Sequence, residues 1–199
     1  MLHRNFNRFF VITGGPGSGK TTLINALAAC GFTVMPEGAR AIIQQQVATG
    51  GTALPYPKSD HLAFAELMLD WDLRSYHAAQ PGSPTTARFA VNGLEALAGP
   101  VIFDRGIPDV LGYLQLCGLP VPPHFEEAAR RHRYHRRVFF APPWEAIFTQ
   151  DRERKQTMEE ARATYDVMFD VYSRLGYELL PLPLATVEER VAFVRDIIE

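Results

Sequence analysis

Short apolar runs and longer amphipathic stretches alternate along the chain. Five runs rich in β-branched and aromatic residues predict strands; they are Phe9–Ile12, Thr33–Met35, Pro100–Asp104, Arg137–Ala141 and Glu178–Leu180. Longer stretches with amphipathic, helix-like patterning separate them. This alternation is typical of a parallel sheet whose strands are joined by crossover helices. We therefore expect an open α/β fold.

The helices are predicted from the same pattern and from their end signals. They span about Thr21–Ala29, Ala39–Val47, Asp60–Ala79, Arg88–Ala98 and 157–175, with a last helix from Thr186. Gly31 and Gly176 stand where a helix can end on a left-handed residue. Two capping boxes, Thr157 with Glu160 and Thr186 with Glu189, predict the starts of the last two helices.

The first predicted strand leads into a glycine-rich loop. Residues Gly14–Thr21 read Gly-Gly-Pro-Gly-Ser-Gly-Lys-Thr and fit the phosphate-binding pattern G-x-x-x-x-G-K-[ST]. Glycines let successive N–H groups face phosphate oxygens, and the following helix dipole adds to the attraction. We expect Lys20 to reach the β- and γ-phosphates and the Thr21 hydroxyl to coordinate Mg²⁺. The residues expected to bind ATP are Gly15, Pro16, Gly17, Ser18, Gly19, Lys20, Thr21 and Thr22.

Composition restricts the number of domains and the kinds of partner that we expect. The 199 residues, 47% hydrophobic and 21% charged, suit one globular domain over 1–199. A net charge of −2 gives no general attraction for nucleic acid or membranes, and no apolar stretch is long enough to span a bilayer. Cys30 and Cys117 lie in apolar settings, which favours buried thiols over a disulfide. Cleavage of the N-terminal run as a signal would destroy the loop, so we expect a cytoplasmic protein.

Asp104 and Arg105 end the third predicted strand. Ligands of open parallel sheets bind at the carboxyl ends of the strands, so both side chains are candidates for catalysis. We expect Asp104 to hold Mg²⁺ beside Thr21; the alternative is a turn or capping aspartate, because Gly106 and Pro108 follow. Arg105 is expected to brace the transferring phosphoryl group or clamp a substrate oxyanion, or else to form a salt bridge at the sheet rim.

Glu37 follows the second predicted strand at the same edge of the sheet. Its carboxylate can accept a proton from a substrate hydroxyl or orient that hydroxyl. Arg40 comes one helical turn later and can pair with Glu37 or hold the substrate. The alternative for Glu37 is an acid in the first turn that stabilises its own helix.

Arg152 and Arg154 lie between the fourth strand and a capped helix. An arginine-bearing segment there, about residues 142–157, suits a lid that closes on the phosphates and offsets their charge. The alternative is a solvated turn of alternating charges.

Other polar and aromatic clusters favour structural roles. Residues 130–137 are basic, but the acids Glu126 and Glu127 beside them favour a solvated helix face over a nucleic-acid patch. The aromatic residues of the predicted helix over 60–79 favour the core over a base-stacking platform. Asp72 on that helix is a candidate substrate contact.

Taken together, these motifs resemble a P-loop family that contains the kinase domain of NadR-type proteins and related predicted ATPases. The matching segments are Gly14–Thr21, Pro36–Arg40, Phe103–Asp109, Asp151–Arg154 and Leu175–Leu179. Glu37 and the Asp104-Arg105 pair are also similar to elements of deoxyribonucleoside kinases. The resemblance implies a nucleotide-kinase-like P-loop NTPase fold: an open five-stranded parallel sheet of order 2-3-1-4-5, helices on both faces and a short lid.

Two functional hypotheses follow from the motifs and the resemblance. The first is a Mg-ATP-dependent kinase that phosphorylates a small hydroxyl-bearing metabolite such as a nucleoside or nucleotide, with the acceptor bound by residues 50–100. Its catalytic residues would be Lys20, Glu37, Asp104, Arg105, Arg152 and Arg154, with Thr21 and Asp104 on the metal. The alternative is a regulatory ATPase or GTPase switch that acts on a protein partner. The absence of a guanine-reading N-K-x-D motif favours ATP.

Overall fold

A computed structural model describes residues 5–80, 99–148 and 157–198 of the chain. Five strands form one sheet of order β2-β3-β1-β4-β5, and every neighbouring pair is parallel. The strands are β1 (Phe9–Gly14), β2 (Thr33–Met35), β3 (Val101–Asp104), β4 (Arg137–Ala141) and β5 (Glu178–Pro181). The predicted α/β fold, its parallel sheet and its strand order are confirmed.

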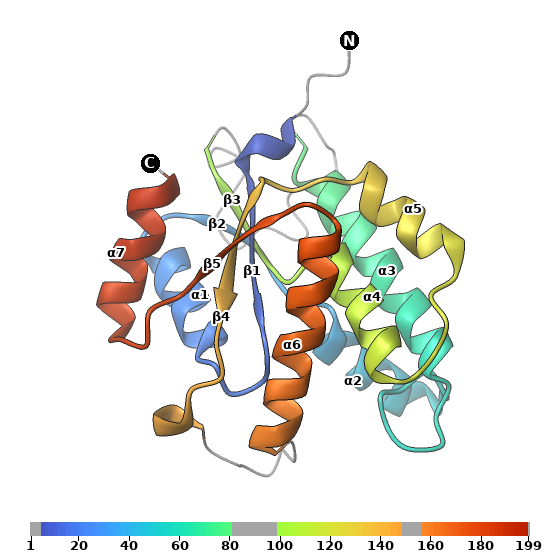
Figure 1. Ribbon diagram of the computed structural model, residues 1–199. Coiled ribbons are helices and arrows are strands. Elements are labelled where there is room, and N and C mark those ends of the chain that lie inside the picture. The colour runs from blue at the N-terminus through green and yellow to red at the C-terminus, as the bar shows by residue number, and fades with distance from the viewer. Residues whose placement is uncertain (1–4, 81–98, 149–156, 199) are drawn as a thin grey trace.

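Helices cover both faces of this sheet (Figure 1). They are α1 (Lys20–Ala29), α2 (Ala39–Thr49), α3 (His61–Ala78), α4 (Ile107–Leu116), α5 (Pro123–Arg131), α6 (Met158–Arg174) and α7 (Val187–Ile198), with short 3₁₀ turns η1 (Asn5–Arg8) and η4 (Glu145–Ile147). Both predicted capping boxes form, for example through the Glu160 N–H, which donates to Thr157 Oγ1 at 3.1 Å. The helix predicted over 88–98 lies outside the described residues.

The sequence pattern did not predict helix α4, because Gly106 and Pro108 are also typical of turns. In the structure Pro108 is the second residue of the helix, which begins at Ile107. Proline fits the first helical turn because the N–H groups there have no partner within the helix, and its fixed φ already suits the helix. The same reason explains α5, which begins at Pro123.

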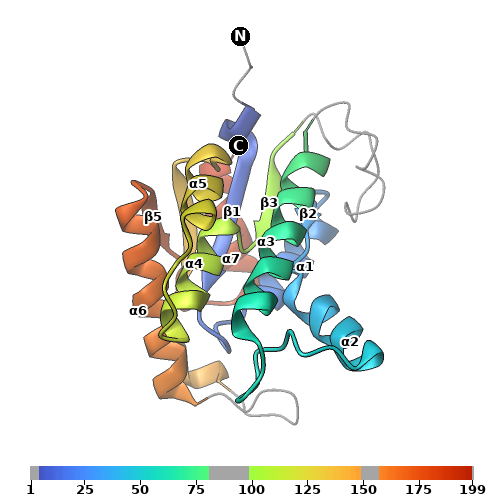
Figure 2. The same cartoon turned by 90° about the vertical axis from the view of Figure 1, so that its right-hand side faces the viewer.

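Alternate strand residues face two different layers. Phe9, Val11 and Phe103 point into a core shared with α3, α4, α5 and α6. Their neighbours Phe10 and Ile12 point into a second core shared with α1 and α7. Figure 2 shows α3 and α4 on the first face. The period of two follows from strand geometry, and because both faces are covered, β1 is buried along its whole length.

Several surface features also bear on the sequence predictions. Cys30 is exposed, and Cys117 is partly exposed, so the expectation of buried thiols is wrong for Cys30, which caps the solvent end of α1. Arg130 pairs with Glu126 across one turn of α5, and both side chains are exposed. The solvated helix face predicted over 130–137 is confirmed for Arg130 and Arg131 only, because α5 ends at Arg131 and Arg137 begins β4. Within the described ranges, no helix is long and apolar enough to cross a bilayer.

Candidate active site

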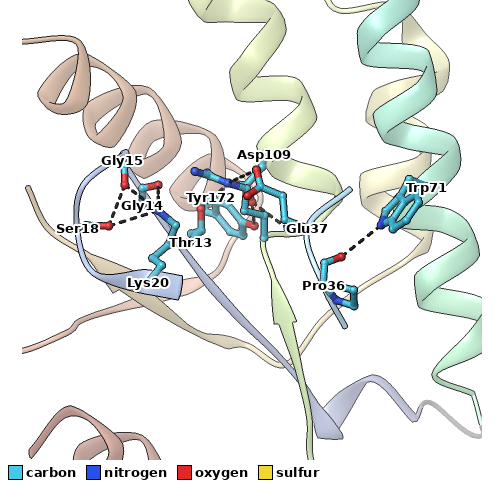
Figure 3. A network of polar contacts seen from close by, with 12 residues as sticks. Thr13, Gly14, Gly15, Ser18, Lys20, Pro36, Glu37, Trp71, Asp109 and Tyr172 are labelled. Atoms are coloured by element: carbon cyan, nitrogen blue, oxygen red, sulfur yellow. Dashed lines mark hydrogen bonds and ion pairs between the residues drawn. The ribbon is translucent and has the colours of Figure 1, made fainter. Parts of the chain in front are cut away.

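The glycine-rich loop wraps around the end of β1 and the start of α1. Lys20 is buried, and its Nζ donates to the carbonyl oxygens of Gly14 at 2.9 Å and Gly15 at 2.7 Å. Gly14 has φ 134°, and a side chain there would overlap the Ala141 carbonyl at the end of β4. Only glycine fits so close to β4, which explains why glycine stands at position 14 of the loop (Figure 3).

Residues after β4 and on α7 cover the outer side of the loop. A side chain at Gly17 would overlap the Phe148 ring, and one at Gly19 would approach Arg190 Nη1 at 2.7 Å. Arg190 is only 3% exposed and donates to the Ser18 carbonyl at 3.2 Å. No acidic partner for this guanidinium lies in the described ranges. Sequence reasoning missed Arg190, because nothing in its local pattern separates it from the other charged residues of α7.

Lys20 and the acids at the strand ends share one electrostatic environment. Burial, and then the Arg105 charge, lower the pKa of Lys20 to about 7, although Asp104, Glu37 and Asp109 oppose the shift. A lysine so desolvated gains much from an anion placed beside it. The lysine that the sequence assigned to phosphate binding therefore lies in the same electrostatic field as the acids predicted at the edge of the sheet.

Asp104 lies at the carboxyl end of β3 and fits a metal-binding role. Its Oδ1 atom is buried and has no hydrogen-bond partner in the part of the chain that the structure describes. Burial, and then the nearby Glu37 carboxylate, raise the pKa of Asp104 to about 6. A buried carboxylate oxygen without a donor is costly unless a cation pairs with it.

The residues present fit a Mg²⁺ site that is shared with phosphates and waters better than a metal site built wholly from protein ligands. No group of three His, Cys, Asp or Glu side chains converges as a metal site among the described residues. Magnesium is usually held by one or two carboxylates together with substrate phosphates and waters. Asp104 with the Thr21 hydroxyl, exposed at the start of α1, matches that pattern.

Arg105 occupies an unusual backbone position beside Asp104. Its φ is 67°, in the left-handed region that residues other than glycine rarely adopt. Arg105 Nε lies 3.0 Å from Glu37 Oε1, and Nη1 lies 3.0 Å from Asp109 Oδ1. Burial alone would lower the pKa of Arg105, but the carboxylates of Glu37, Asp109 and Asp104 outweigh it and raise the pKa. The guanidinium is thus a fixed positive charge between two acids.

Asp109 is the centre of this arrangement. Its Oδ1 accepts from Thr13 Oγ1 and Arg105 Nη1, and its Oδ2 accepts from the Gly106 N–H at 3.0 Å and the Tyr172 hydroxyl at 2.6 Å. The carboxylate is buried. Sequence reasoning gave Asp109 no role, although the spacing Asp-Arg-Gly-x-x-Asp placed it one helical turn after Arg105.

Glu37 faces the same edge from the β2–α2 loop. Its side chain is 39% exposed, against 20% for Arg105, so of the two it is the more open to solvent. Trp71 of α3 packs on Gly38 and donates from Nε1 to the Pro36 carbonyl at 3.3 Å. This contact, labelled at Pro36 and Trp71 in Figure 3, fixes the loop that carries Glu37.

Asp72 adds a further acid from α3. It is partly buried and forms no hydrogen bond or ion pair with the residues that the structure describes. Burial, and then the charges of Asp109 and Glu37, raise the pKa of Asp72 well above its ordinary value. Its predicted substrate contact stays a prediction, whereas Phe64 and Tyr76 of the same helix belong to the core.

The predicted site residues thus divide into two groups. Lys20, Glu37, Asp104 and Arg105 come together at the carboxyl end of the sheet, each within electrostatic range of the others. Arg152 and Arg154 lie outside the described residues, and their lid role stays a prediction.

Comparisons with known proteins identify a family and a fold for this chain. A sequence model of one protein family, described as an AAA domain, matches residues 9–190. The chain belongs to this AAA-domain family. Among curated proteins, no sequence matches the chain.

Solved structures show the same fold at low sequence identity. The NadR protein in complex with NAD and AMP-PNP has a TM-score of 0.66 at 17% identity, covering 96% of this chain and 49% of NadR. Thymidylate kinase from Ehrlichia chaffeensis has a TM-score of 0.58 at 14% identity, covering 96% and 97%. Shikimate kinase from Acinetobacter baumannii, in complex with shikimate, has a TM-score of 0.55 at 13% identity, covering 98% and 93%. The chain therefore spans about half of NadR, and the predicted resemblance of its fold to that of NadR-type proteins is confirmed.

Proposed function

We propose that this chain is a Mg-ATP-dependent kinase that phosphorylates a hydroxyl group of a small metabolite such as a nucleoside or nucleotide. One observation carries the proposal: the exposed carboxylate of Glu37 pairs with Arg105 at the sheet edge that also holds Lys20 and Asp104. A phosphate-binding loop alone suits any nucleotide hydrolase. A base-like carboxylate opposite it suits transfer to a hydroxyl.

The donor phosphates would bind in the loop of residues 14–21. The loop N–H groups, the start of α1 and Lys20 favour the β- and γ-phosphates. Mg²⁺, held by Asp104 and Thr21, would neutralise charge on these phosphates. ATP as the donor agrees with the AMP-PNP bound by NadR.

The acceptor would approach from the side of Glu37 and residues 50–100. A hydroxyl oxygen attacks the γ-phosphorus, the bond from that phosphorus to the β–γ bridging oxygen breaks, and ADP leaves. Glu37 receives the hydroxyl proton or orients the hydroxyl for attack. Arg105, with Arg152 and Arg154 of a lid over about 142–157, offsets charge on the transferring group.

The test is a survey of acceptors. ADP production from Mg-ATP would be measured against nucleosides, nucleoside monophosphates, nicotinamide riboside, shikimate and sugars, and the products would be examined by mass spectrometry. We expect one acceptor class to raise turnover at least tenfold over the background and to appear as a phosphate ester. If no compound stimulates turnover although Mg-ATP binds tightly, the kinase proposal is wrong and a nucleotide-dependent switch replaces it.

A further inference from the structure

Asp109 is a buried carboxylate that neither nucleotide binding nor proton transfer requires directly. It is 6% exposed, yet it accepts hydrogen bonds from three separate parts of the fold. Thr13 comes from β1, Arg105 and the Gly106 N–H from the β3–α4 junction, and Tyr172 from α6. Figure 3 shows Thr13, Asp109 and Tyr172 gathered beside Glu37.

These contacts leave Asp109 little freedom. A buried carboxylate is stable only when its oxygens are satisfied by donors or cations. Here each oxygen has two donors, so neither can turn away without losing a charge-assisted hydrogen bond. The fixed carboxylate in turn holds one nitrogen of the Arg105 guanidinium at 3.0 Å.

Arg105 needs such a restraint because other acids compete for it. Asp104 lies within electrostatic range of its guanidinium in addition to Glu37 and Asp109, and so does Asp72. An arginine side chain has several rotatable bonds and would turn toward whichever carboxylate is best placed. The hydrogen bond to Asp109 selects the orientation in which Arg105 Nε lies 3.0 Å from Glu37 Oε1, as an ion pair without a hydrogen bond from Nε.

We propose that Asp109, held in place by Thr13 and Tyr172, is a positioning residue that aims the Arg105 guanidinium at Glu37 for phosphoryl transfer. This inference rests on the proposed kinase function and adds to it residues that contact neither substrate. It predicts that the Tyr172 hydroxyl, on the core-facing side of α6, affects the acceptor side of the reaction.

Helix α6 then contacts both halves of the site. A side chain at Gly15 would overlap the Ala161 carbonyl near the start of α6, so this helix packs on the phosphate loop. Farther along the helix, Tyr172 donates to Asp109. The spacing between the loop and the Arg105–Glu37 pair is therefore set partly by one rigid element.

The test compares two tyrosine hydroxyls in the same buried cluster. Tyr172→Phe removes the donor to Asp109, whereas Tyr177→Phe removes a hydroxyl that accepts from the Tyr134 N–H at 3.3 Å and does not bond Asp109. We expect Tyr172→Phe to lower kcat/KM for the acceptor about tenfold or more, with the Kd of AMP-PNP within twofold of wild type. Tyr177→Phe should leave both values within twofold, whatever its effect on Tm.

A second pair of variants acts from the other side of Asp109. Thr13→Val keeps the side-chain shape but removes the donor, and Thr13→Ser keeps it. Thr13→Val should reproduce the loss seen in Tyr172→Phe, and Thr13→Ser should retain activity within about threefold. Equal losses in Tyr172→Phe and Tyr177→Phe, or in both Thr13 variants, would mean that these residues support the fold only and would overturn the proposal.

The orientation of Arg105 can also be followed without any reaction. In ¹⁵N-labelled protein, the guanidinium signals of Arg105 are assigned by their loss in Arg105→Lys. They should shift or broaden in Tyr172→Phe and stay in place in Tyr177→Phe. If wild type phosphorylates no acceptor, the kinase function fails, but this spectrum still decides the positioning role. Unchanged Arg105 signals in Tyr172→Phe would contradict it.

Discussion

The two halves of the site are built in different ways. The side proposed for the phosphates comes from one continuous segment, in which backbone groups and Lys20 would make the contacts. The side proposed for the acceptor is assembled from side chains of separate elements: Glu37 after β2, Asp72 on α3, Arg105 after β3 and Asp109 on α4. A contiguous loop depends on local geometry alone, whereas the dispersed set depends on how the helices pack against the sheet.

This difference suggests how variation is tolerated in each half. The phosphate side cannot change without altering the backbone, since glycines such as Gly14 contact neighbouring strands directly. The acceptor side can change one side chain at a time. We therefore expect substitutions in the first half to abolish the reaction outright, and those in the second half to separate acceptor use from nucleotide binding.

The largest effect should come from Lys20→Ala on the phosphate side. The ammonium group is buried and directed into the loop, so its loss removes the charge that steadies the transferring phosphate. We expect phosphoryl transfer to fall by about 10³-fold or more, with the circular dichroism spectrum unchanged. Arg130→Ala, at an exposed arginine of α5, serves as the control. Comparable losses in both variants would remove Lys20 from the mechanism.

Glu37→Gln should lower turnover without weakening nucleotide binding. The amide keeps the size of the side chain but cannot take a proton, so turnover should fall about 10²–10³-fold while AMP-PNP binds as in wild type. Glu126→Gln changes an exposed acid that pairs with Arg130 on α5 and should be silent. Near-normal turnover in Glu37→Gln would exclude Glu37 as the base or orienting group.

Arg190→Met should affect nucleotide binding and leave acceptor use alone. Arg190 donates to the Ser18 carbonyl from α7, and without it this part of the loop loses a support. We expect the Kd of AMP-PNP to rise about tenfold, with the acceptor KM unchanged, by calorimetry and steady-state kinetics. Arg174→Met, at an exposed arginine of α6, is the matched control. A raised acceptor KM with normal nucleotide affinity would contradict the assignment.

The smallest effect concerns stability at Asp72. Burial and the charges of Asp109 and Glu37 raise the pKa of its carboxyl above the ordinary 3.8, so the folded state holds this proton more tightly than the unfolded state. The stabilisation is complete below that ordinary value and is lost as pH rises through the raised folded pKa. Asp72→Asn does not titrate, so the difference in Tm between variant and wild type should grow in favour of the variant from about pH 4 to pH 8. A difference independent of pH would show that Asp72 is not desolvated.

The same contrast explains what could be predicted from the sequence. The strand order and the loop followed from strand patterning, one contiguous motif and a family resemblance, and Glu37, Asp104 and Arg105 followed from the rule that strand ends bind ligands. The links of Asp109 to Thr13 and Tyr172 could not be predicted, because they join residues far apart in sequence. Arg190 was missed for the same reason: its role depends on α7 packing over the loop.

The central claim is that the γ-phosphoryl group reaches an organic hydroxyl rather than water. The most direct test labels the γ-phosphate of ATP and follows it in wild type and Glu37→Gln with the acceptor that most stimulates turnover. The account predicts that the label appears in a phosphate ester in wild type and largely fails to do so in the variant. Label found only in inorganic phosphate, at equal rates in both proteins, would contradict it.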